Sequence, residues 1–239
     1  MTAKAFVALV TCFNDDETIN FDATRAQVRR QVQAGNNIMC AGTNGDFTAL
    51  TYDEKVALTE AVVDEVAGKA RVIVNAGLGK GAPYGKGSHY ANRQTIETNV
   101  LGAAIQTEAA MAIFREQKAG HLVLIASVTA LRGMPKSMTT YGASKAFLAS
   151  LGEGIRSELM GKPELDIDVT VLYPGYIRSE MNEKVEQKTK FMVDTETGVR
   201  AMVVAIEGRK AKALVPAKPW VAVGSAMKVL PLSVVRKML

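Results

Sequence analysis

Short runs of apolar and β-branched residues alternate with longer segments of helical periodicity along almost the whole chain. Six of the short runs predict strands, at Ala5–Thr11, Asn37–Ala41, Arg71–Asn75, His121–Ala126, Ile167–Leu172 and Ala213–Val215. The segments between them predict helices at about Phe21–Ala34, Tyr52–Ala67, Tyr90–Lys118, Thr140–Met160 and Thr195–Gly208. Strands that alternate with helices are typical of a parallel sheet with helical crossovers. No repeat or linker divides the pattern, so we expect one α/β domain over residues 1–239.

Composition and charge exclude several classes of protein. Apolar residues make up 48% of the 239 residues and charged residues 22%, as in an ordinary globular protein. The net charge of +5 is small, so we expect no nucleic-acid partner. The two cysteines, Cys12 and Cys40, and the two histidines, His89 and His121, are too few for a usual zinc site. We therefore expect free thiols, a reducing compartment and no metal.

Both ends of the chain carry apolar stretches, and neither is suited to cross a membrane. The run at 5–10 is short and predicts a strand rather than a signal peptide. The stretch at 213–232 is interrupted by Lys218, Pro219 and Lys228 and is too broken to span a bilayer. We expect a cytoplasmic protein. For the tail from Pro219 onward we favour a substrate lid or a dimer-packing segment, with a membrane-surface anchor as the alternative.

Tyr141 and Lys145 stand four residues apart in a predicted helix and so share one of its faces. A lysine ammonium beside the phenol favours the phenolate and lowers a tyrosine pKa that is ordinarily about 10. Such a phenol can exchange a proton with a substrate hydroxyl near neutral pH. Ser127 follows the strand at 121–126, where parallel sheets open the crevice that binds ligands. The three residues together predict a catalytic site, although a tyrosine above a lysine is by itself common on helices.

Three further segments of the chain add to these three residues. Asn75-Ala76-Gly77 follows a predicted strand, Asn99 lies within a predicted helix, and Pro174-Gly175-Tyr176-Ile177-Arg178-Ser179 follows the strand at 167–172. With Ser127, Tyr141 and Lys145, these segments make residues 75–239 resemble the second half of a short-chain dehydrogenase/reductase.

The resemblance implies an NAD or NADP cofactor and hydride transfer to or from a carbon that bears a hydroxyl or carbonyl. Tyr141 would be the general acid or base, and Ser127 would polarise the substrate oxygen. Lys145 would lower the pKa of Tyr141 and hold the nicotinamide ribose, so that both residues contact the cofactor. Asn99 would hold a water that links Lys145 to solvent. The other cofactor contacts would come from Asn75, Ala76 and Gly77 on the adenine side and from Pro174, Gly175 and Ile177 at the nicotinamide carboxamide.

The first third of the chain carries a different set of motifs, at Ala8-Leu9-Val10-Thr11, Phe21-Asp22, Gly42-Thr43-Asn44-Gly45-Asp46 and Arg71-Val72-Ile73-Val74. These make residues 5–77 resemble the opening of the dihydrodipicolinate synthase and N-acetylneuraminate lyase (β/α)8 barrels. The two resemblances meet at 72–77. We therefore interpret the chain as a chimera, engineered or recombined, with one divergent natural family as the alternative. Lyase activity is not expected, because that family's Schiff-base lysine lies on later barrel strands that this chain lacks.

The turn after the first predicted strand lacks the glycines that the dehydrogenase family carries there. Those glycines let backbone amides approach a pyrophosphate at a helix N-terminus. Here the turn is Thr11-Cys12-Phe13-Asn14-Asp15-Asp16-Glu17, whose acids would repel a pyrophosphate. Two glycine clusters are weak substitutes: Gly77–Gly81 lacks the spacing of a P-loop, and Gly42–Asp46 suits a tight turn. Unless another loop substitutes, cofactor affinity falls by orders of magnitude.

These observations predict an open, Rossmann-like parallel sheet of about six strands with flanking helices. We prefer the flavodoxin-like strand order 2-1-3-4-5-6; the alternative is the barrel-like order 1-2-3-4-5-6, with the helices crowded on one face. The first functional hypothesis is an NAD(P)-dependent oxidoreductase for a small alcohol or ketone, and the second is an inactive chimeric scaffold. By resemblance, the helices at 90–118 and 140–160 would join copies in a homodimer or homotetramer.

Overall fold

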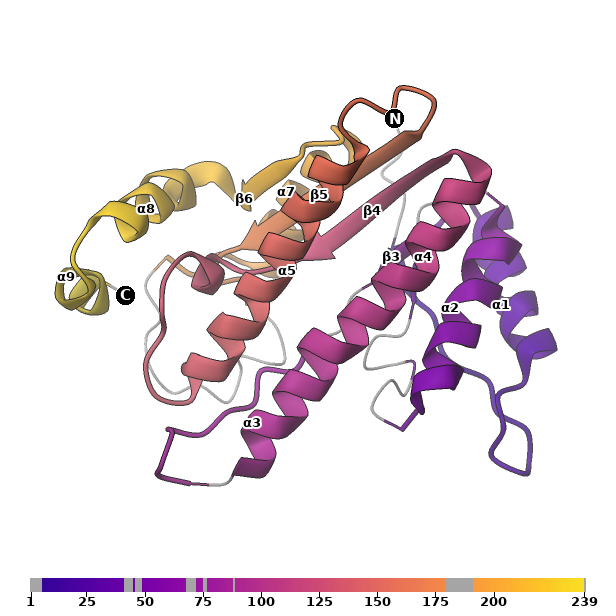
Figure 1. Ribbon diagram of the computed structural model, residues 1–239, viewed down its shortest axis with the longest axis horizontal. Helices are drawn as coiled ribbons and strands as arrows, with labels where there is room; N and C mark the ends of the chain where they lie inside the picture. Colours follow the sequence, from indigo (N-terminus) through magenta and orange to yellow (C-terminus); the bar gives the residue numbers. More distant parts are fainter. Residues whose placement is uncertain are drawn as a thin grey trace. The chain divides into compact units, whose positions relative to one another are not determined.

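Strands and helices alternate along the chain as the hydrophobic pattern predicts (Figure 1). The computed structural model describes residues 6–40, 45, 49–67, 72–74, 77–87, 89–178 and 191–238. The strands are β1 (Phe6–Ala8), β2 (Asn37–Cys40), β3 (Val72–Val74), β4 (Ala119–Ile125), β5 (Asp166–Pro174) and β6 (Lys212–Val215). The α-helices are α1 (Phe21–Gln33), α2 (Tyr52–Val66), α3 (His89–Ile96), α4 (Ala103–Gln117), α5 (Met138–Leu159), α7 (Thr195–Glu207), α8 (Ala217–Val229) and α9 (Leu232–Met238). The described residues also form a π-helix, η2 (Glu97–Gly102), and a 3-10 turn, η3 (Val128–Leu131).

The strands form one sheet in the order β1-β2-β3-β4-β5-β6. β1 pairs with β2, β2 with β3, and β5 with β6, all in parallel, and Phe6 lies opposite Asn37. The parallel α/β sheet is confirmed, but the preferred order 2-1-3-4-5-6 is wrong and the barrel-like alternative is right. The physical reason is that each crossover leads to the next strand along, so right-handed crossovers place successive helices on one face. Consistent with this, α2 packs against both α1 and α4.

Two compact units make up the chain, each assembled from separated segments of sequence. The first comprises Met1–Gly77, Glu97–Val123 and Arg156–Asp168. The second comprises Leu78–Ile96, Leu124–Ile155 and Val169–Leu239. β4 and β5 each contribute residues to both units.

In the first unit, α1 and α2 both begin at side-chain caps. Asn20 Oδ1 accepts a hydrogen bond from the Ala23 amide at 2.9 Å. Thr51 and Glu54 form a reciprocal capping box at the start of α2. α1 then packs against β2, and α2 packs against β3. The core of this unit includes Val28, Ile38, Leu58 and Val62.

In the second unit, α5 approaches the sheet closely because it presents a glycine there. A Cβ on Gly152 would overlap the side chain of Val171 and press on Leu124. Toward the end of the chain, α8 buries Trp220, Gly224 and Met227 on one face. In this unit α5 therefore packs on β4 and β5, and α8 packs against β6 and η3.

Two parts of the chain differ from the predicted elements. The predicted helix at 90–118 is divided, because the π-helix η2 separates α3 from α4. The tail forms α8 and α9, which the pattern did not predict because Lys218 and Pro219 interrupt its periodicity. No helix in the described part of the chain is long and apolar enough to cross a membrane. Within the same ranges, no three His, Cys, Asp or Glu side chains gather in a way that could hold a metal ion. In the described part of the chain, neither Cys12 nor Cys40 forms a disulfide.

Candidate active site

Ser127 lies just beyond the carboxyl end of β4, at the residue that caps η3. Its backbone is extended, and its Oγ accepts a hydrogen bond from the Thr129 amide at 3.2 Å. This contact fixes the hydroxyl at the end of the strand, where the sequence placed it. The nearby Thr129 Oγ1 is buried and has no hydrogen-bond partner among the described atoms. The turn therefore presents two hydroxyls, one of them unsatisfied.

α5 brings Tyr141 and Lys145 together in its first two turns. The Lys145 Nζ lies 5.7 Å from the centre of the Tyr141 ring. The Tyr141 phenol is hydrogen-bonded to the Ser127 side chain. The second unit thus brings together Ser127, Tyr141 and Lys145, as the spacing predicted.

The pKa of Tyr141 is raised above its ordinary value of 10.0. Burial raises it most, the hydrogen bond with Ser127 lowers it, and the neighbouring Tyr176 raises it again. The spacing of Tyr141 and Lys145 predicted a lowered pKa, but the pKa of Tyr141 is raised overall, because loss of solvent outweighs the hydrogen bond with Ser127. At neutral pH Tyr141 is a phenol that can donate a proton.

Lys145 is fully buried, and burial lowers its pKa from 10.5 to about 8. Its Nζ donates to the Ile125 carbonyl oxygen at 2.9 Å. An ammonium has three donors, and the described atoms satisfy only this one. A buried cation with free donors suits a ligand that brings hydroxyl oxygens.

The segment after β5 is fixed on several sides. The Gly175 amide donates to the Val215 carbonyl at 2.9 Å, and the Val193 amide donates to the Tyr176 carbonyl at 3.0 Å. Ile177 forms an isolated bridge with Val193. The predicted residues Pro174, Gly175 and Ile177 therefore lie on a well-anchored backbone in the same unit as Ser127 and Tyr141.

The packing of two aromatic residues at this site, Tyr176 and Trp220, was not predicted from the sequence. A Cβ on Gly175 would overlap the Trp220 indole, so the glycine packs directly on that ring. The Tyr176 ring meets Trp220 edge-on, at 5.3 Å between centroids and 77° between planes. The only signal was a single tryptophan in a tail of small apolar residues, and nothing in the sequence linked it to 174–177.

Four other predicted site residues belong to the first unit or lie outside the described residues. Asn99 is fully buried on η2 of the first unit. Gly77 ends a segment of that unit and is half-buried. Asn75 and Ala76 lie outside the described residues. The roles predicted for all four stay predictions.

The turn between β1 and α1 is closed by its own hydrogen bonds. The Asn14 amide donates to the Thr18 carbonyl at 2.8 Å, and Asp16 accepts from the backbone and hydroxyl of Thr18. These Thr18 hydrogen bonds lower the pKa of Asp16, so its carboxylate is charged at neutral pH. At the helix start, Asn20 occupies the Ala23 amide. The turn offers a carboxylate and a capped helix where a phosphate cradle would need free amides.

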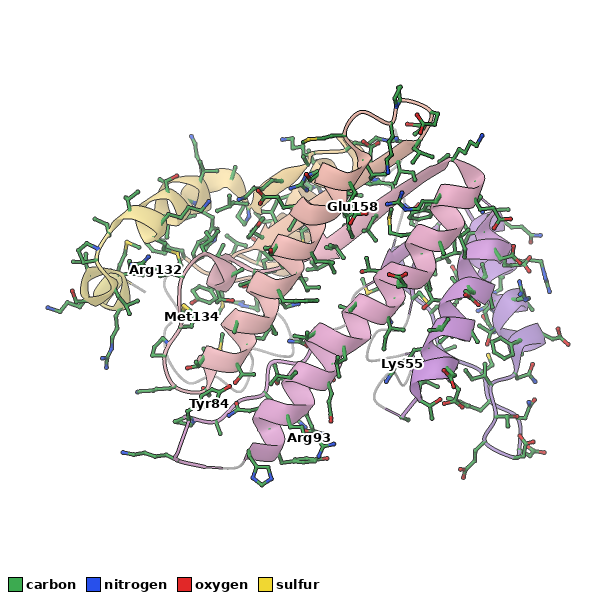
Figure 2. All side chains as sticks on the ribbon, in the orientation of Figure 1. Lys55, Tyr84, Arg93, Arg132, Met134 and Glu158 are labelled. Carbon is green, nitrogen blue, oxygen red and sulfur yellow. The ribbon has the colours of Figure 1, made fainter. Side chains whose placement is uncertain are left out.

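The two glycine clusters have structural roles where they are described. A Cβ on Gly81 would overlap the Ser137 backbone, and the Lys80 carbonyl accepts a hydrogen bond from Thr95 Oγ1 at 2.6 Å. In the same segment, the Tyr84 hydroxyl accepts a 3.2 Å hydrogen bond from Thr140 Oγ1 at the start of α5 (Figure 2). In the other cluster only Gly45 is described, and its carbonyl accepts from the buried Thr11 hydroxyl at 2.7 Å.

Part of the chain is similar to barrel enzymes. A 4-hydroxy-tetrahydrodipicolinate synthase of Pelodictyon phaeoclathratiforme is 44% identical over 72 residues, which cover 30% of this chain and 24% of that protein. A family model described as short chain dehydrogenase matches residues 15–190, and so begins well before the predicted junction at 72–77. The two matches do not establish a chimera, which stays a prediction.

Similarity to dehydrogenases extends over most of the chain. An uncharacterized oxidoreductase of Mycobacterium tuberculosis is 49% identical over 174 residues, which cover 73% of this chain and 67% of that protein. A short chain dehydrogenase from Burkholderia cenocepacia, solved in complex with NADP, has a TM-score of 0.65 and 20% identity, covering 100% of this chain and 99% of that one. That likeness confirms the Rossmann-like α/β fold. Because the family model also matches well over half of the sequence, the chain belongs to the short chain dehydrogenase family.

Proposed function

We propose that this protein is an NAD(P)-dependent oxidoreductase that interconverts a small alcohol and the corresponding ketone or aldehyde. The observation that carries the proposal is the hydrogen bond between Ser127 and Tyr141 above the buried ammonium of Lys145. When bound, NAD(P) supplies or accepts the hydride. The similar Burkholderia cenocepacia structure, which holds NADP, supports this cofactor class.

The protein's own residues would handle the proton. Tyr141 is a phenol at neutral pH, so it donates its proton to a carbonyl oxygen in the direction of reduction. Ser127 holds that oxygen beside the phenol. Lys145 uses its free donors to orient ribose hydroxyls and contributes positive charge beneath the ring. Asn99 is assigned the water relay by family resemblance alone.

The residues present fit one end of the cofactor better than the other. Around Lys145, a buried cation with free donors suits the nicotinamide ribose. The backbone around Pro174, Gly175 and Ile177 is anchored, because the Gly175 amide donates to the Val215 carbonyl and Ile177 is bridged to Val193, as a carboxamide partner requires. The turn after β1 does not fit a pyrophosphate, because it presents Asp16 and a helix already capped by Asn20. We therefore expect weak cofactor binding that depends on the nicotinamide end.

Titration of the purified protein with NADH and NADPH tests the proposal, with nicotinamide fluorescence as the signal and heat-denatured protein as the blank. Saturable binding, followed by turnover with a panel of aliphatic, aromatic and polycyclic ketones, is the expected result. A Ser127→Ala variant should keep the binding and lose most of the turnover. No saturation with either cofactor contradicts the proposal.

The geometry of the β1–α1 turn also favours a second candidate, a folded scaffold without catalysis that derives from two parent proteins. The similarity of 72 residues of this chain to a 4-hydroxy-tetrahydrodipicolinate synthase supports that origin. The same titration separates the two candidates, because a scaffold binds neither cofactor. Association into a homodimer or homotetramer is proposed from family resemblance and is measured by sedimentation.

A further inference from the structure

The net positive charge of the protein comes from its last 32 residues. Glu207 is the last acidic residue, and residues 208–239 contain seven lysines and arginines and no Asp or Glu. The whole chain has 29 basic and 24 acidic side chains, so residues 1–207 carry 22 and 24, a net charge of −2. The net charge of +5 therefore belongs to the tail. The site described above uses none of these seven cations.

α8 and α9 present apolar side chains to solvent beside these cations. The inner face of α8 is buried, with Trp220 and Met227 fully enclosed. Outside, Val221 is 52% exposed and Val229 81% exposed, and Leu232 and Val234 of α9 follow at 53% and 45%. Exposed apolar surface that is flanked by charged side chains is typical of sites that meet another protein or a membrane. We name this surface, with Lys218, Lys228, Arg236 and Lys237, the tail face.

The four cations of the tail face have no ion-pair partner in the described part of the chain. Lys218, Lys228, Arg236 and Lys237 are all exposed. Elsewhere arginines do form ion pairs, such as Arg115 with Glu158 at 2.9 Å (Figure 2). The tail face therefore combines free positive charge with exposed apolar surface.

The tail face is held firmly by the body of its unit. Trp220 packs against Gly175, and a Cβ on Gly224 would overlap Leu214 and press on Leu131. Arg132 Nη2 donates to the Leu230 carbonyl at 3.4 Å, at the junction between the two helices (Figure 2). Figure 1 shows α8 and α9, in yellow, extending from β6. The exposed side chains therefore belong to a fixed surface.

We propose that the tail face binds the surface of an anionic lipid bilayer. Helices that lie on a membrane combine exposed Leu and Val with lysines and arginines that meet the lipid headgroups. The helices lie on the bilayer and do not cross it, because no described helix is long and apolar enough to do so. A second copy of the chain is a poorer partner, since a two-fold contact would bring these cations opposite one another.

The test measures co-sedimentation of the full chain with phospholipid vesicles. Vesicles of equal parts phosphatidylglycerol and phosphatidylcholine should bind the protein, and vesicles of phosphatidylcholine alone should not. High salt should weaken the binding because it screens the headgroup charge. The assay needs neither cofactor nor turnover, so its outcome is independent of the proposed oxidoreductase activity.

Matched variants test whether vesicle binding depends on the tail face or on positive charge anywhere on the protein. Each cation near an anionic membrane is worth roughly fivefold in partitioning, so Lys228→Gln, Arg236→Gln and Lys237→Gln together should lower binding roughly a hundredfold. The control replaces three exposed cations elsewhere, Arg30, Lys86 and Lys162, with glutamine. A second pair compares Val229→Gln with Met160→Gln, because Met160 is 75% exposed and lies outside the tail.

Loss of vesicle binding in the tail variants, with binding kept in both controls, supports the proposal. Equal loss in the control variants overturns it, because the attraction is then not specific to the tail face. Absence of vesicle binding by the unmodified protein also overturns it. If sedimentation instead detects self-association that Val229→Gln abolishes, the face covers a second copy and the membrane proposal is wrong.

Discussion

The turn after β1 and the turn after β4 differ in whether their polar groups are available to a ligand. Both follow a strand of the parallel sheet. The turn after β4 presents Ser127 and an unsatisfied Thr129 hydroxyl. In the turn after β1 the polar side chains are already hydrogen-bonded: Asp16 accepts from Thr18, and Asn20 caps the start of α1. The difference indicates that a strand end becomes a site only where its polar groups are left for a ligand.

The largest expected effect is at the β4 side, where Tyr141→Phe removes the proton donor. Turnover should fall roughly a hundredfold to ten-thousandfold, the usual contribution of general acid catalysis. The unfolding free energy should change little, because the phenyl ring is kept. The control is Tyr90→Phe, which alters a tyrosine that is 61% exposed on α3. Undiminished turnover by Tyr141→Phe would remove Tyr141 from the mechanism.

The second effect concerns the cost of burying Lys145. Its pKa in the folded protein is about 8, against 10.5 in water, so the unfolded chain binds more protons between these two pH values. The contribution of Lys145 to the unfolding free energy therefore rises with pH across that interval and is lowest below pH 8. Relative to Lys145→Met, which cannot titrate, the unmodified protein should gain about 3 kcal/mol in unfolding free energy over this interval.

Denaturant unfolding at a series of pH values measures that gain. The control is Lys162→Met, because Lys162 is exposed and should give a difference that does not vary with pH. A flat difference for Lys145→Met as well would mean that the ammonium is solvated in the folded protein.

Much of the site was predictable because its information is local in sequence. Tyr141 and Lys145 lie on one helix face by spacing alone, and Ser127 follows a strand that the pattern identifies. The bounds of α1 and α7 agree with the predicted helices to within a residue. In each case neighbouring residues carried the signal.

Other features depend on contacts between distant segments, and the sequence did not reveal them. The raised pKa of Tyr141 follows from burial, which the Tyr141/Lys145 spacing does not report. Trp220 meets Gly175 only through tertiary packing. The strand order follows from how α2 packs between α1 and α4, and local periodicity is the same in either order.

The third prediction tests the packing of Trp220 against Gly175, just after β5. Gly175→Ala places a methyl group where the Trp220 indole lies, so the backbone or the ring must move. We expect a loss of about 1–3 kcal/mol in unfolding free energy, typical of overpacking. The control is Gly154→Ala on α5, where the added Cβ meets nothing within 4 Å. That change should stabilise the helix by about 1 kcal/mol, so equal effects of the two variants would contradict the packing argument.

The smallest effect compares the helix caps of the two units and returns to the turn after β1. Asn20 caps α1 through the Ala23 amide at 2.9 Å, and Asp194 caps α7 through the Thr197 amide at 2.8 Å. Asn20→Ala should lower the unfolding free energy by about 1 kcal/mol at any pH, because an amide cap does not titrate.

Asp194→Ala should behave differently in acid. The hydrogen bonds from Thr197 lower the pKa of Asp194 below 3.8, so its cap is complete above that pH and is lost as the pH falls through the lowered value. Unfolding of both variants measured between neutral and strongly acidic pH checks this contrast. Cofactor titration of Asn20→Ala completes the test: an unchanged affinity supports a turn that does not contact phosphate. A markedly weaker affinity would show that the capped turn takes part in binding after all.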